Sequence, residues 1–237
     1  MIKVDHYSLQ VGGFSLKNIS LDIEQGEIFA ILGETGSGKT LLLESMAGFY
    51  EKFSGSIIYG EEKVHEIPLE ERQMGFVYQD FALFPHMKVR ANVEYGMRMR
   101  GKRRRECFEK SQEMMELLGI AHLSDRYPGT LSGGEQQRTA LARALVTEPR
   151  VLFMDEPFSA LDPNTKKQMY DLVRKIHGLF GCTIVFVTHD FHEAELLADR
   201  TAVMIGGRIR RVCDSKSLFS GNEDQEVIKF LGEFVKN

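Results

Sequence analysis

The sequence predicts an α/β protein built around a largely parallel sheet. Short runs that are apolar at every position alternate with helix-like segments, and such runs are typical of strands covered on both faces. With 237 residues, of which 43% are apolar, the chain is long enough for a sizeable core. The strand-like runs are residues 28–32, 75–78, 151–154 and 184–187. Residues 40–47 and 164–180 have helical character, and each segment is followed by a glycine stop signal, Gly48 and Gly181.

Two regions depart from this alternation. Residues 85–149 contain no strand-like run, and helices are predicted over 106–118 and 133–146, which indicates an all-helical insert. The alternating pattern at 19–23 predicts an N-terminal antiparallel β subdomain. We expect one domain over 1–237, with an α/β core from 1–84 and 150–207, the helical subdomain at 85–149 and a C-terminal tail at 208–237.

Composition narrows the function classes. A net charge of −4, from 30 basic and 34 acidic residues, gives no global basic field, so we expect no nucleic-acid partner. Three widely spaced cysteines are typical of reduced thiols in a cytosolic protein. The N-terminus lacks a signal-peptide pattern, and no apolar run approaches the ~20 residues that span a bilayer. A basic cluster at 98–105 is either a solvated turn or a contact for lipid headgroups or an acidic partner.

A phosphate-binding motif follows the first strand-like run. Residues 33–40 fit G-x-x-x-x-G-K-[ST] in full, between a strand and a helix, so a chance glycine-rich turn is the weaker interpretation. The glycines let backbone N–H groups surround phosphate oxygens, and the next helix directs its positive end there. Lys39 is predicted to reach the β- and γ-phosphates and Thr40 to hold Mg²⁺. The predicted ATP-binding residues are Gly33, Glu34, Thr35, Gly36, Ser37, Gly38, Lys39 and Thr40.

Two carboxylates end the third strand-like run. Asp155 is a candidate Mg²⁺ ligand, direct or through water, and Glu156 is a candidate general base for the attacking water. In isolation an apolar run followed by Asp-Glu would be a surface strand end. Behind a phosphate-binding loop it is the expected second half of a P-loop NTPase site of the RecA-like kind.

A pair of adjacent glycines, Gly133 and Gly134, lies in a segment that resembles a family signature. The run Leu131-Ser132-Gly133-Gly134-Glu135-Gln136 resembles the signature of ABC-type ATPases. Ser132, the glycine amides of Gly133 and Gly134, and a helix N-terminus make another anion cradle, which is explained if it serves the nucleotide of a second copy. A capped helix start, with Ser132 as N-cap and Glu135 closing a capping box, accounts for the same residues except the paired glycines.

The resemblance to ABC ATPases spans residues 26–207 and implies further site residues. It implies that Gln79 contacts Mg²⁺ and water and that His189 contacts the γ-phosphate. It also implies that Ser159 and Asp162 lie in a loop at the dimer seam. Taken alone, a histidine at a strand end would be structural or solvent-facing. With this resemblance, the predicted metal ligands are Thr40, Gln79 and Asp155, and the predicted catalytic residues are Lys39, Gln79, Glu156 and His189.

The sequence offers more than one candidate for the residue that would stack on adenine. ABC ATPases place an aromatic side chain near the N-terminus for this purpose, and Phe14 is the nearest candidate. Tyr7 is the second candidate, Val11 is an alternative occupant of the usual position, and Phe14 is equally suited to a core position.

The resemblance implies an Mg²⁺-dependent ATPase that works as a homodimer, or with a paired ATPase subunit, peripherally on the cytoplasmic face of the membrane. Its partners would be transmembrane permease subunits and, indirectly, a solute-binding protein. Residues 78–87 and 92–97 resemble importer ATPases, and the molybdate/tungstate group is favoured over sulfate, iron, polyamine and sugar importers. The alternative class is a soluble ABC ATPase outside transport. Because the chain stops after a helical segment at 218–235, we expect no feedback through a further C-terminal domain.

Overall fold

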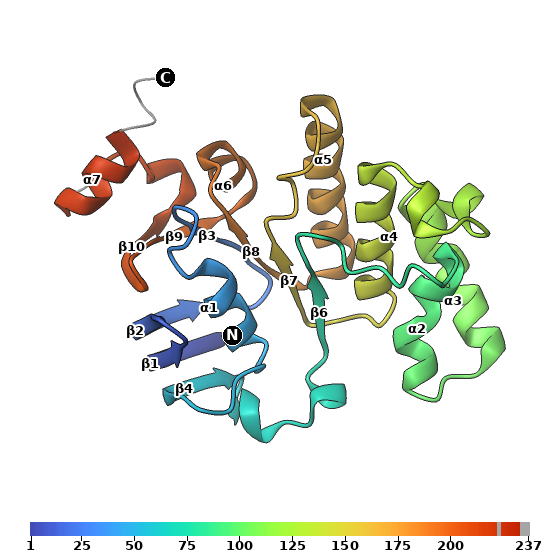
Figure 1. Cartoon of the computed structure of the whole chain (residues 1–237), viewed down its shortest axis with the longest axis horizontal. Helices are drawn as coiled ribbons and strands as arrows, with labels where there is room; N and C mark the ends of the chain where they lie inside the picture. Colours follow the sequence, from blue (N-terminus) through green and yellow to red (C-terminus); the bar gives the residue numbers. More distant parts are fainter. Residues whose placement is uncertain (222–223, 233–237) are drawn as a thin grey trace. The chain divides into compact units, whose positions relative to one another are not determined.

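A computed structural model describes residues 1–221 and 224–232 (Figure 1). The chain divides into two compact units, one formed by residues 1–72 and 183–237 and the other by residues 73–182. These boundaries do not coincide with the predicted ones at 85 and 149, because strands and a long helix group with the helical segment. Each unit is described by itself.

The first unit contains an antiparallel sheet of four strands in the order β2-β1-β4-β5. Its strands are β1 (Ile2–Val11), β2 (Phe14–Ile23), β4 (Ser54–Tyr59) and β5 (Glu62–Lys63). Alternate residues of β1 and β2 are buried, which is the pattern of a sheet with one covered face. The predicted N-terminal antiparallel subdomain is confirmed, and it extends on both sides of residues 19–23.

The first unit also contains four strands in the order β10-β9-β3-β8. These are β3 (Ile28–Leu32), β8 (Thr183–Thr188), β9 (Arg200–Ile205) and β10 (Arg208–Asp214). β3 lies between β8 and β9 and runs parallel to both. All residues of β3 and β8 are buried, as their uninterrupted apolar sequences predict.

The helices of this unit are α1 (Lys39–Met46), α6 (Phe191–Leu197) and α7 (Gln225–Gly232), and short 3₁₀ turns occupy Val64–Glu66, Leu69–Glu71 and Ser215–Ser217. Within the predicted tail at 208–237, residues Arg208–Asp214 form strand β10. Of the helical segment predicted at 218–235, residues 222–223 and 233–235 lie outside the described residues. Helix α7 packs through Val227, Phe230 and Leu231 against a cluster that includes Leu32.

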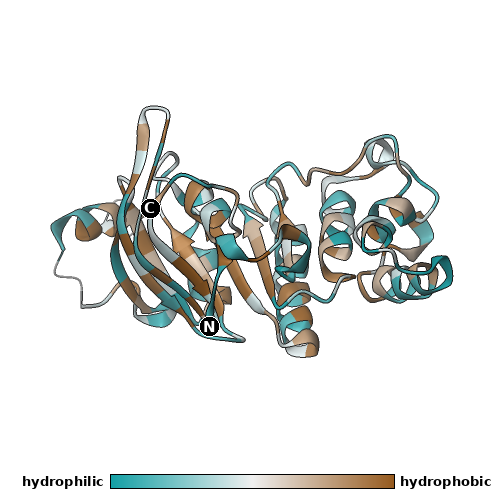
Figure 2. Cartoon of the chain, turned by 90° about the horizontal axis from the view of Figure 1, so that it is seen from below, coloured by the Kyte–Doolittle hydropathy of each residue, from teal (hydrophilic) through white to brown (hydrophobic). Residues whose placement is uncertain are grey.

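The second unit has one parallel strand pair, β6 (Met74–Val77) and β7 (Val151–Asp155). Its helices are α2 (Val89–Met99), α3 (Arg104–Leu117), α4 (Gly133–Leu145) and α5 (Pro163–Phe180), with 3₁₀ turns at Ala121–Leu123 and Pro128–Thr130. Helix α5 ends at Gly181, whose φ of 59° is left-handed, as the glycine stop signal predicts. Figure 2 shows apolar residues along the strands and polar residues on turns and outer helix faces. The predicted α/β class and the strand-free insert are confirmed.

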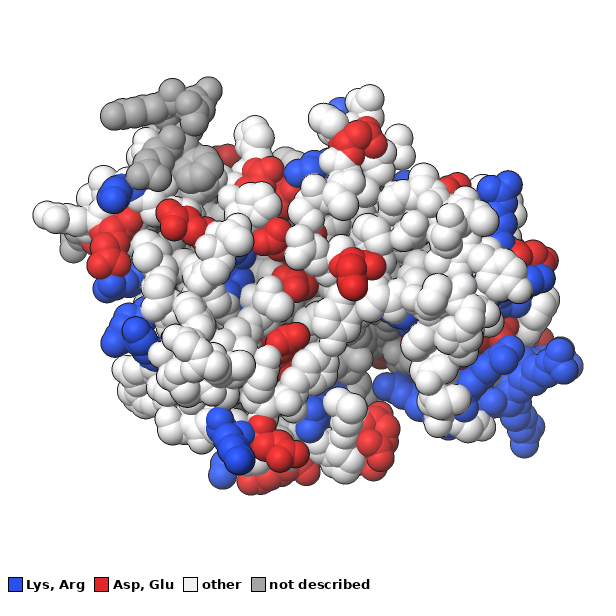
Figure 3. Space-filling model, in the orientation of Figure 1, with Lys and Arg blue, Asp and Glu red and all other residues white. Residues whose placement is uncertain are grey.

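In the basic cluster at the α2–α3 turn, three of the six basic side chains of residues 98–105 form ion pairs. Arg98 binds Glu94, Lys102 binds Glu106 at 3.1 Å, and Arg105 binds Glu109 at 2.7 Å. Figure 3 shows this cluster over the α2–α3 end of the molecule. The pairing favours a solvated turn over a dedicated headgroup site. Among the described residues, no helix combines the length and apolarity that crossing a bilayer requires.

Candidate nucleotide site

The phosphate-binding loop leaves the end of β3 and enters α1. Gly36 and Gly38 have φ of 81° and 102°, values that favour glycine. Among the described residues, no acceptor binds the amides of Gly36 and Gly38. The Nζ of Lys39 donates to the carbonyls of Gly33 at 2.8 Å and Glu34 at 2.9 Å. Open amides and a cation at a helix N-terminus are the donor set that binds phosphate, so these residues fit a nucleoside triphosphate.

His189 emerges beside this loop. In the parallel register, Leu32 lies opposite Thr188, and the amide of Gly33 donates to the carbonyl of Thr188 at 3.3 Å. The hydroxyl of Thr188 accepts from the amide of Asp190 at 3.0 Å and donates to the buried Glu193. Asp190 in turn caps α6 by accepting from the amide of His192. His189 is thus exposed on a turn that is fixed on both sides.

Phe14 lies against the same loop. The Cε1 of its ring is 2.7 Å from the point where a Cβ on Gly38 would stand, and Cζ is 3.5 Å from the corresponding point on Gly207. The ring is half-buried between these glycines. This placement supports the core interpretation of Phe14, whereas its contact with adenine stays a prediction.

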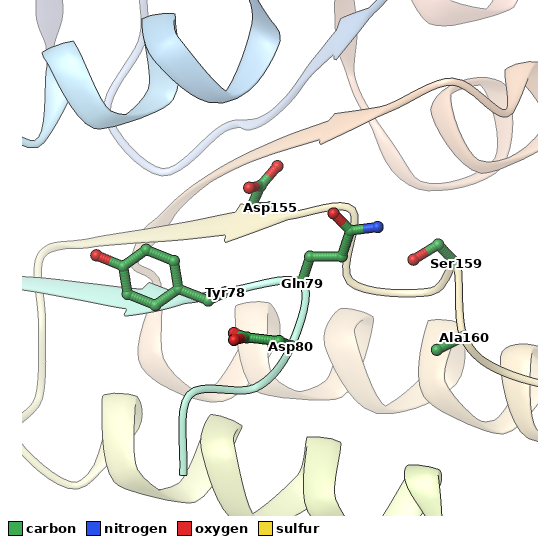
Figure 4. A pocket seen from close by; sticks show the side chains of 6 residues that line it. All are labelled: Tyr78, Gln79, Asp80, Asp155, Ser159 and Ala160. Carbon is green, nitrogen blue, oxygen red and sulfur yellow. The ribbon is translucent and has the colours of Figure 1, made fainter. Parts of the chain in front are cut away.

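The second unit brings Gln79, Asp155 and Ser159 to one cavity of about 670 Å³, together with Tyr78, Asp80 and Ala160. The parallel register of β6 and β7, with Val77 opposite Met154, ends both strands at the same edge. Figure 4 shows the Gln79 side chain extending between the Asp155 carboxylate and the Ser159 hydroxyl, whereas the Tyr78 ring points away. Asp155 is buried and Gln79 is exposed.

Glu156 has a left-handed backbone, with φ of 40°. A non-glycine residue in this region costs of order 1–3 kcal/mol, and such strain concentrates at functional sites. The turn is held by Ser159, whose hydroxyl donates to the carbonyl of Glu156 at 3.0 Å.

The signature segment forms the predicted capping box. Glu135 accepts from the amide of Ser132 at 2.7 Å and from its hydroxyl at 2.9 Å, and these bonds lower the pKa of the Glu135 carboxyl. Ser132 is exposed at the N-terminus of α4. A steric constraint that was not predicted from the sequence favours glycine at position 134, because a Cβ on Gly134 would stand 2.9 Å from the Cγ2 of Thr165 on α5. For Gly133 the nearest atom is the Ala160 carbonyl oxygen at 4.0 Å.

Asp162 caps α5. Its Oδ1 accepts from the amides of Asn164 at 3.1 Å and Thr165 at 3.2 Å, and the Thr165 hydroxyl also donates to the carboxylate. Bonds from Thr165 lower the pKa of Asp162, so the carboxylate is charged at neutral pH. The buried Gln137 of α4 donates to the carbonyl of Pro157, which connects α4 to the turn between Glu156 and Asp162.

Two residues that hold the loop after Gln79 were missed from sequence. The buried Asn92 accepts from the amide of Phe84 at 2.8 Å and donates to the carbonyls of Phe84 and Met87. Arg143 donates to the carbonyls of Phe81 and Ala82. An Asn placed inside the apolar pattern of α2 was a usable signal, since a buried amide needs partners.

The site residues therefore fall into two groups. The first unit places His189 beside the phosphate-binding loop, and the second places Gln79 with Asp155 and Ser159. Thr40 belongs to the first unit, and the other two predicted metal ligands to the second. Among the described residues, no group of three His, Cys, Asp or Glu side chains could hold a metal. A hydroxyl, a carboxylate and an amide suit Mg²⁺, which takes few protein ligands and completes its shell with phosphate and water.

The ABC transporter family model matches residues 16–159. The chain belongs to the ABC transporter family. It is 45% identical to the molybdate/tungstate import ATP-binding protein WtpC of Pyrococcus horikoshii, over 98% of this chain and 67% of that protein. It is 43% identical to the sulfate/thiosulfate import ATP-binding protein CysA of Halalkalibacterium halodurans, over 98% and 66%. The ABC chain thus spans about two thirds of the length of these relatives.

Solved structures agree with this assignment. The dimeric ATP-binding cassette MJ0796, in a post-hydrolysis state with ADP and Pi, superposes with a TM-score of 0.81 at 29% identity, covering 91% of this chain and 99% of that one. CbiO1 of Clostridium perfringens, part of the ABC transporter complex CbiONQ, superposes with a TM-score of 0.83 at 29% identity, over 100% and 98%. The protein is an ABC-type ATPase, with ATP and Mg²⁺ as its cofactors.

Proposed function

We propose that the chain is the ATP-hydrolysing subunit of an oxyanion importer. The observation that carries this proposal is the second anion cradle, at Ser132, Gly133 and Gly134, in a chain that already has a phosphate-binding loop. Each cradle stands at a helix N-terminus, and the two belong to different units. A second phosphate-binding cradle in the same chain is explained if it binds the nucleotide that the phosphate-binding loop of another copy holds. The relatives' names supply the transport direction.

In this proposal two copies of the chain sandwich two nucleotides. Lys39 and the loop amides bind the β- and γ-phosphates of ATP, and Ser132 of the other copy binds the γ-phosphate. Thr40, Gln79 and Asp155 hold Mg²⁺, which supplies charge neutralisation at the phosphates when bound. Glu156 accepts a proton from water, and His189 contacts the γ-phosphate. Because only ATP completes both cradles, hydrolysis lets the copies separate.

The permease contact is assigned to the loop after Gln79. Leu83, Phe84 and Met87 are half-buried and Ala82 is exposed, which gives this loop an apolar surface unusual for a turn. A membrane subunit that receives this surface would place the ATPase peripherally on the cytoplasmic face of the membrane. The solute-binding protein would act on the ATPase only through that subunit.

The cargo is proposed from the relatives alone. Molybdate, tungstate and sulfate are tetrahedral dianions, and relatives named for the first two and for sulfate are nearly equally similar to this chain. We expect the ATPase residues to touch nucleotide and permease rather than cargo, so these residues do not separate the ions. The proposal is therefore the oxyanion class, with molybdate/tungstate as the first candidate.

Reconstitution tests this proposal. The chain would be combined with its permease in liposomes that contain ATP, and each cargo would be offered with the matching solute-binding protein. Uptake of labelled molybdate or sulfate that needs ATP and is lost in Glu156→Gln is the expected result. ATP-dependent uptake of none of these oxyanions, in a complex that does assemble, would contradict the importer proposal.

A further inference from the structure

The loop after Gln79 is strained at two consecutive residues. Phe81 has φ of 63° and Ala82 has φ of 43°, and neither is glycine. Side chains with a Cβ adopt this left-handed region only when surrounding contacts hold them there. Two local bonds involve the amides of this turn: Ala82 donates to the Asp80 carboxylate at 3.2 Å, and Phe81 donates to the carbonyl of Tyr78 at 2.9 Å. The carbonyls of Phe81 and Ala82 bind a partner from elsewhere in the chain.

That partner is Arg143, near the C-terminal end of α4. One guanidinium nitrogen donates to the carbonyl of Ala82 at 2.6 Å and the other donates to the carbonyl of Phe81 at 2.9 Å. The guanidinium carbon also lies 5.3 Å from the centroid of the Phe84 ring. A planar fork can bridge two adjacent carbonyls, whereas a lysine ammonium is a single point of charge. Both strained residues are thus fixed by one side chain.

Helix α4 carries the signature residues at its other end. Ser132 caps the helix and Arg143 lies near its last turn, about 16 Å along the axis at ~1.5 Å per residue. Gln137, between them, binds the carbonyl of Pro157, next to Glu156. A helix of this length moves as a rigid element, so a displacement at Ser132 is transmitted to Arg143.

We propose that Arg143 is a positioning residue that couples the signature end of α4 to the loop containing Gln79 and the permease-contact surface. This inference rests on the proposed function, in which phosphate of a second copy's nucleotide binds at Ser132. When ATP draws the signature toward phosphate, α4 carries the Phe81–Ala82 turn with it through the guanidinium fork. Arg143 touches neither substrate nor metal and acts through Gln79 and its loop.

Hydrogen exchange in a Glu156→Gln background tests the coupling. In that protein ATP should slow exchange at residues 131–137 and also at 80–87. Adding Arg143→Lys should keep the protection of 131–137 and the ATP-induced dimer, but make the ATP-dependent slowing at 80–87 about tenfold smaller. Full slowing at 80–87 in Arg143→Lys would overturn the inference alone. Absence of any ATP-dependent dimer in Glu156→Gln would refute the proposed function and this inference with it.

Arg138 offers a matched control on the same helix. It also donates to a backbone carbonyl, that of Leu118 at 3.0 Å, but it does not contact the loop after Gln79. Otherwise unaltered proteins with Arg143→Lys and Arg138→Lys would be compared by ATPase kinetics. We expect Arg143→Lys to lower kcat about tenfold with KM for ATP within twofold, because a displaced Gln79 affects the chemical step. Equal effects of both variants on kcat would overturn the specific role of Arg143.

A measurement on the protein without an Arg143 change covers the case in which the variant does not fold. Arginine-selective ¹⁵N NMR would follow the Nη protons of Arg143 in Glu156→Gln with ADP and with ATP. Hydrogen bonds to two carbonyls should make these protons slow to exchange, and the signals should shift between the two nucleotides. Signals that are fast-exchanging or identical in both states would contradict the proposed coupling.

Discussion

The ring of Phe14 lies directly beneath Gly38, at 2.7 Å from the position that a Cβ on this glycine would take. Gly38 is left-handed, with φ of 102°, and the Cδ2 of Leu16 closes the same space at 3.1 Å. The last glycine of the phosphate-binding loop is therefore required by its backbone and by its neighbours. Phe14 supports the loop from a strand of the antiparallel sheet.

Replacing Phe14 separates loop support from adenine stacking. We predict that Phe14→Ala weakens binding of ATP and of inorganic tripolyphosphate by the same factor, on the order of tenfold, because the variant loosens the phosphate loop itself. Isothermal titration calorimetry with both ligands measures this. A loss confined to ATP would instead assign the ring to the base.

The close approach of α4 and α5 predicts that a second substitution, Thr165→Ser, restores the stability lost in Gly134→Ala. Gly134→Ala should destabilise the protein by about 1–3 kcal/mol, since its new Cβ would press on the Cγ2 of Thr165. Thr165→Ser removes that methyl group and keeps the hydroxyl that donates to Asp162. The double variant should therefore recover most of the lost stability in urea unfolding. Equal stability of Gly134→Ala and the parent would show that the helices adjust freely.

The strand–motif–helix order was predictable because it depends on short local patterns. Residues 33–40 and 151–156 place their functional groups directly after strands, and the structure has these strands where they were predicted. Strand β10 was missed because Arg208, Arg210 and Arg211 interrupt its apolar residues, a composition typical of an exposed edge strand.

Contacts between distant segments could not be predicted. Arg143 holds carbonyls that lie 61 and 62 residues away, and no local pattern marks Phe81 and Ala82 as left-handed. The same holds for Gly134, whose steric constraint comes from Thr165 on another helix. The sequence thus indicated the candidate nucleotide-site residues, but it did not indicate the residues that hold them in position.

The capping box at the signature predicts a pH-dependent stability difference. Bonds from Ser132 lower the pKa of Glu135 from its ordinary value of 4.5. A lowered folded-state pKa contributes stability above the unfolded value, and this contribution is lost as pH falls through the folded one. Ser132→Ala should therefore cost about 1 kcal/mol at pH 7. The part that the Ser132 hydroxyl contributes through the Glu135 charge should shrink as pH falls through the lowered pKa of Glu135.

Unfolding by urea at several pH values measures this difference. Ser124→Ala is a suitable reference, because Ser124 lies in the same unit outside the cap and its side chain makes no hydrogen bond among the described residues. A difference between Ser132→Ala and the parent that stays constant from neutral pH down to the acid limit of the folded protein would contradict the role of Glu135 as an ionised cap.

The buried Thr188 should control the turn that carries His189. Thr188→Val removes the acceptor of the Asp190 amide and one donor to the buried Glu193. We predict a loss of about 1–3 kcal/mol in stability. We also expect a lower kcat with an unchanged KM for ATP, measured by steady-state ATPase assays. Thr183→Val, at the far end of β8, should leave kcat unaffected.

The shared nucleotide site is tested most directly by the mass of Glu156→Gln with and without ATP. Size exclusion with light scattering should give one chain, 27.0 kDa, without nucleotide and twice that mass with ATP and Mg²⁺. Adding Ser132→Glu, which places a negative charge in the signature cradle, should keep the mass at one chain. A mass of 27.0 kDa at every ATP concentration, or a dimer that tolerates Ser132→Glu, would contradict the account.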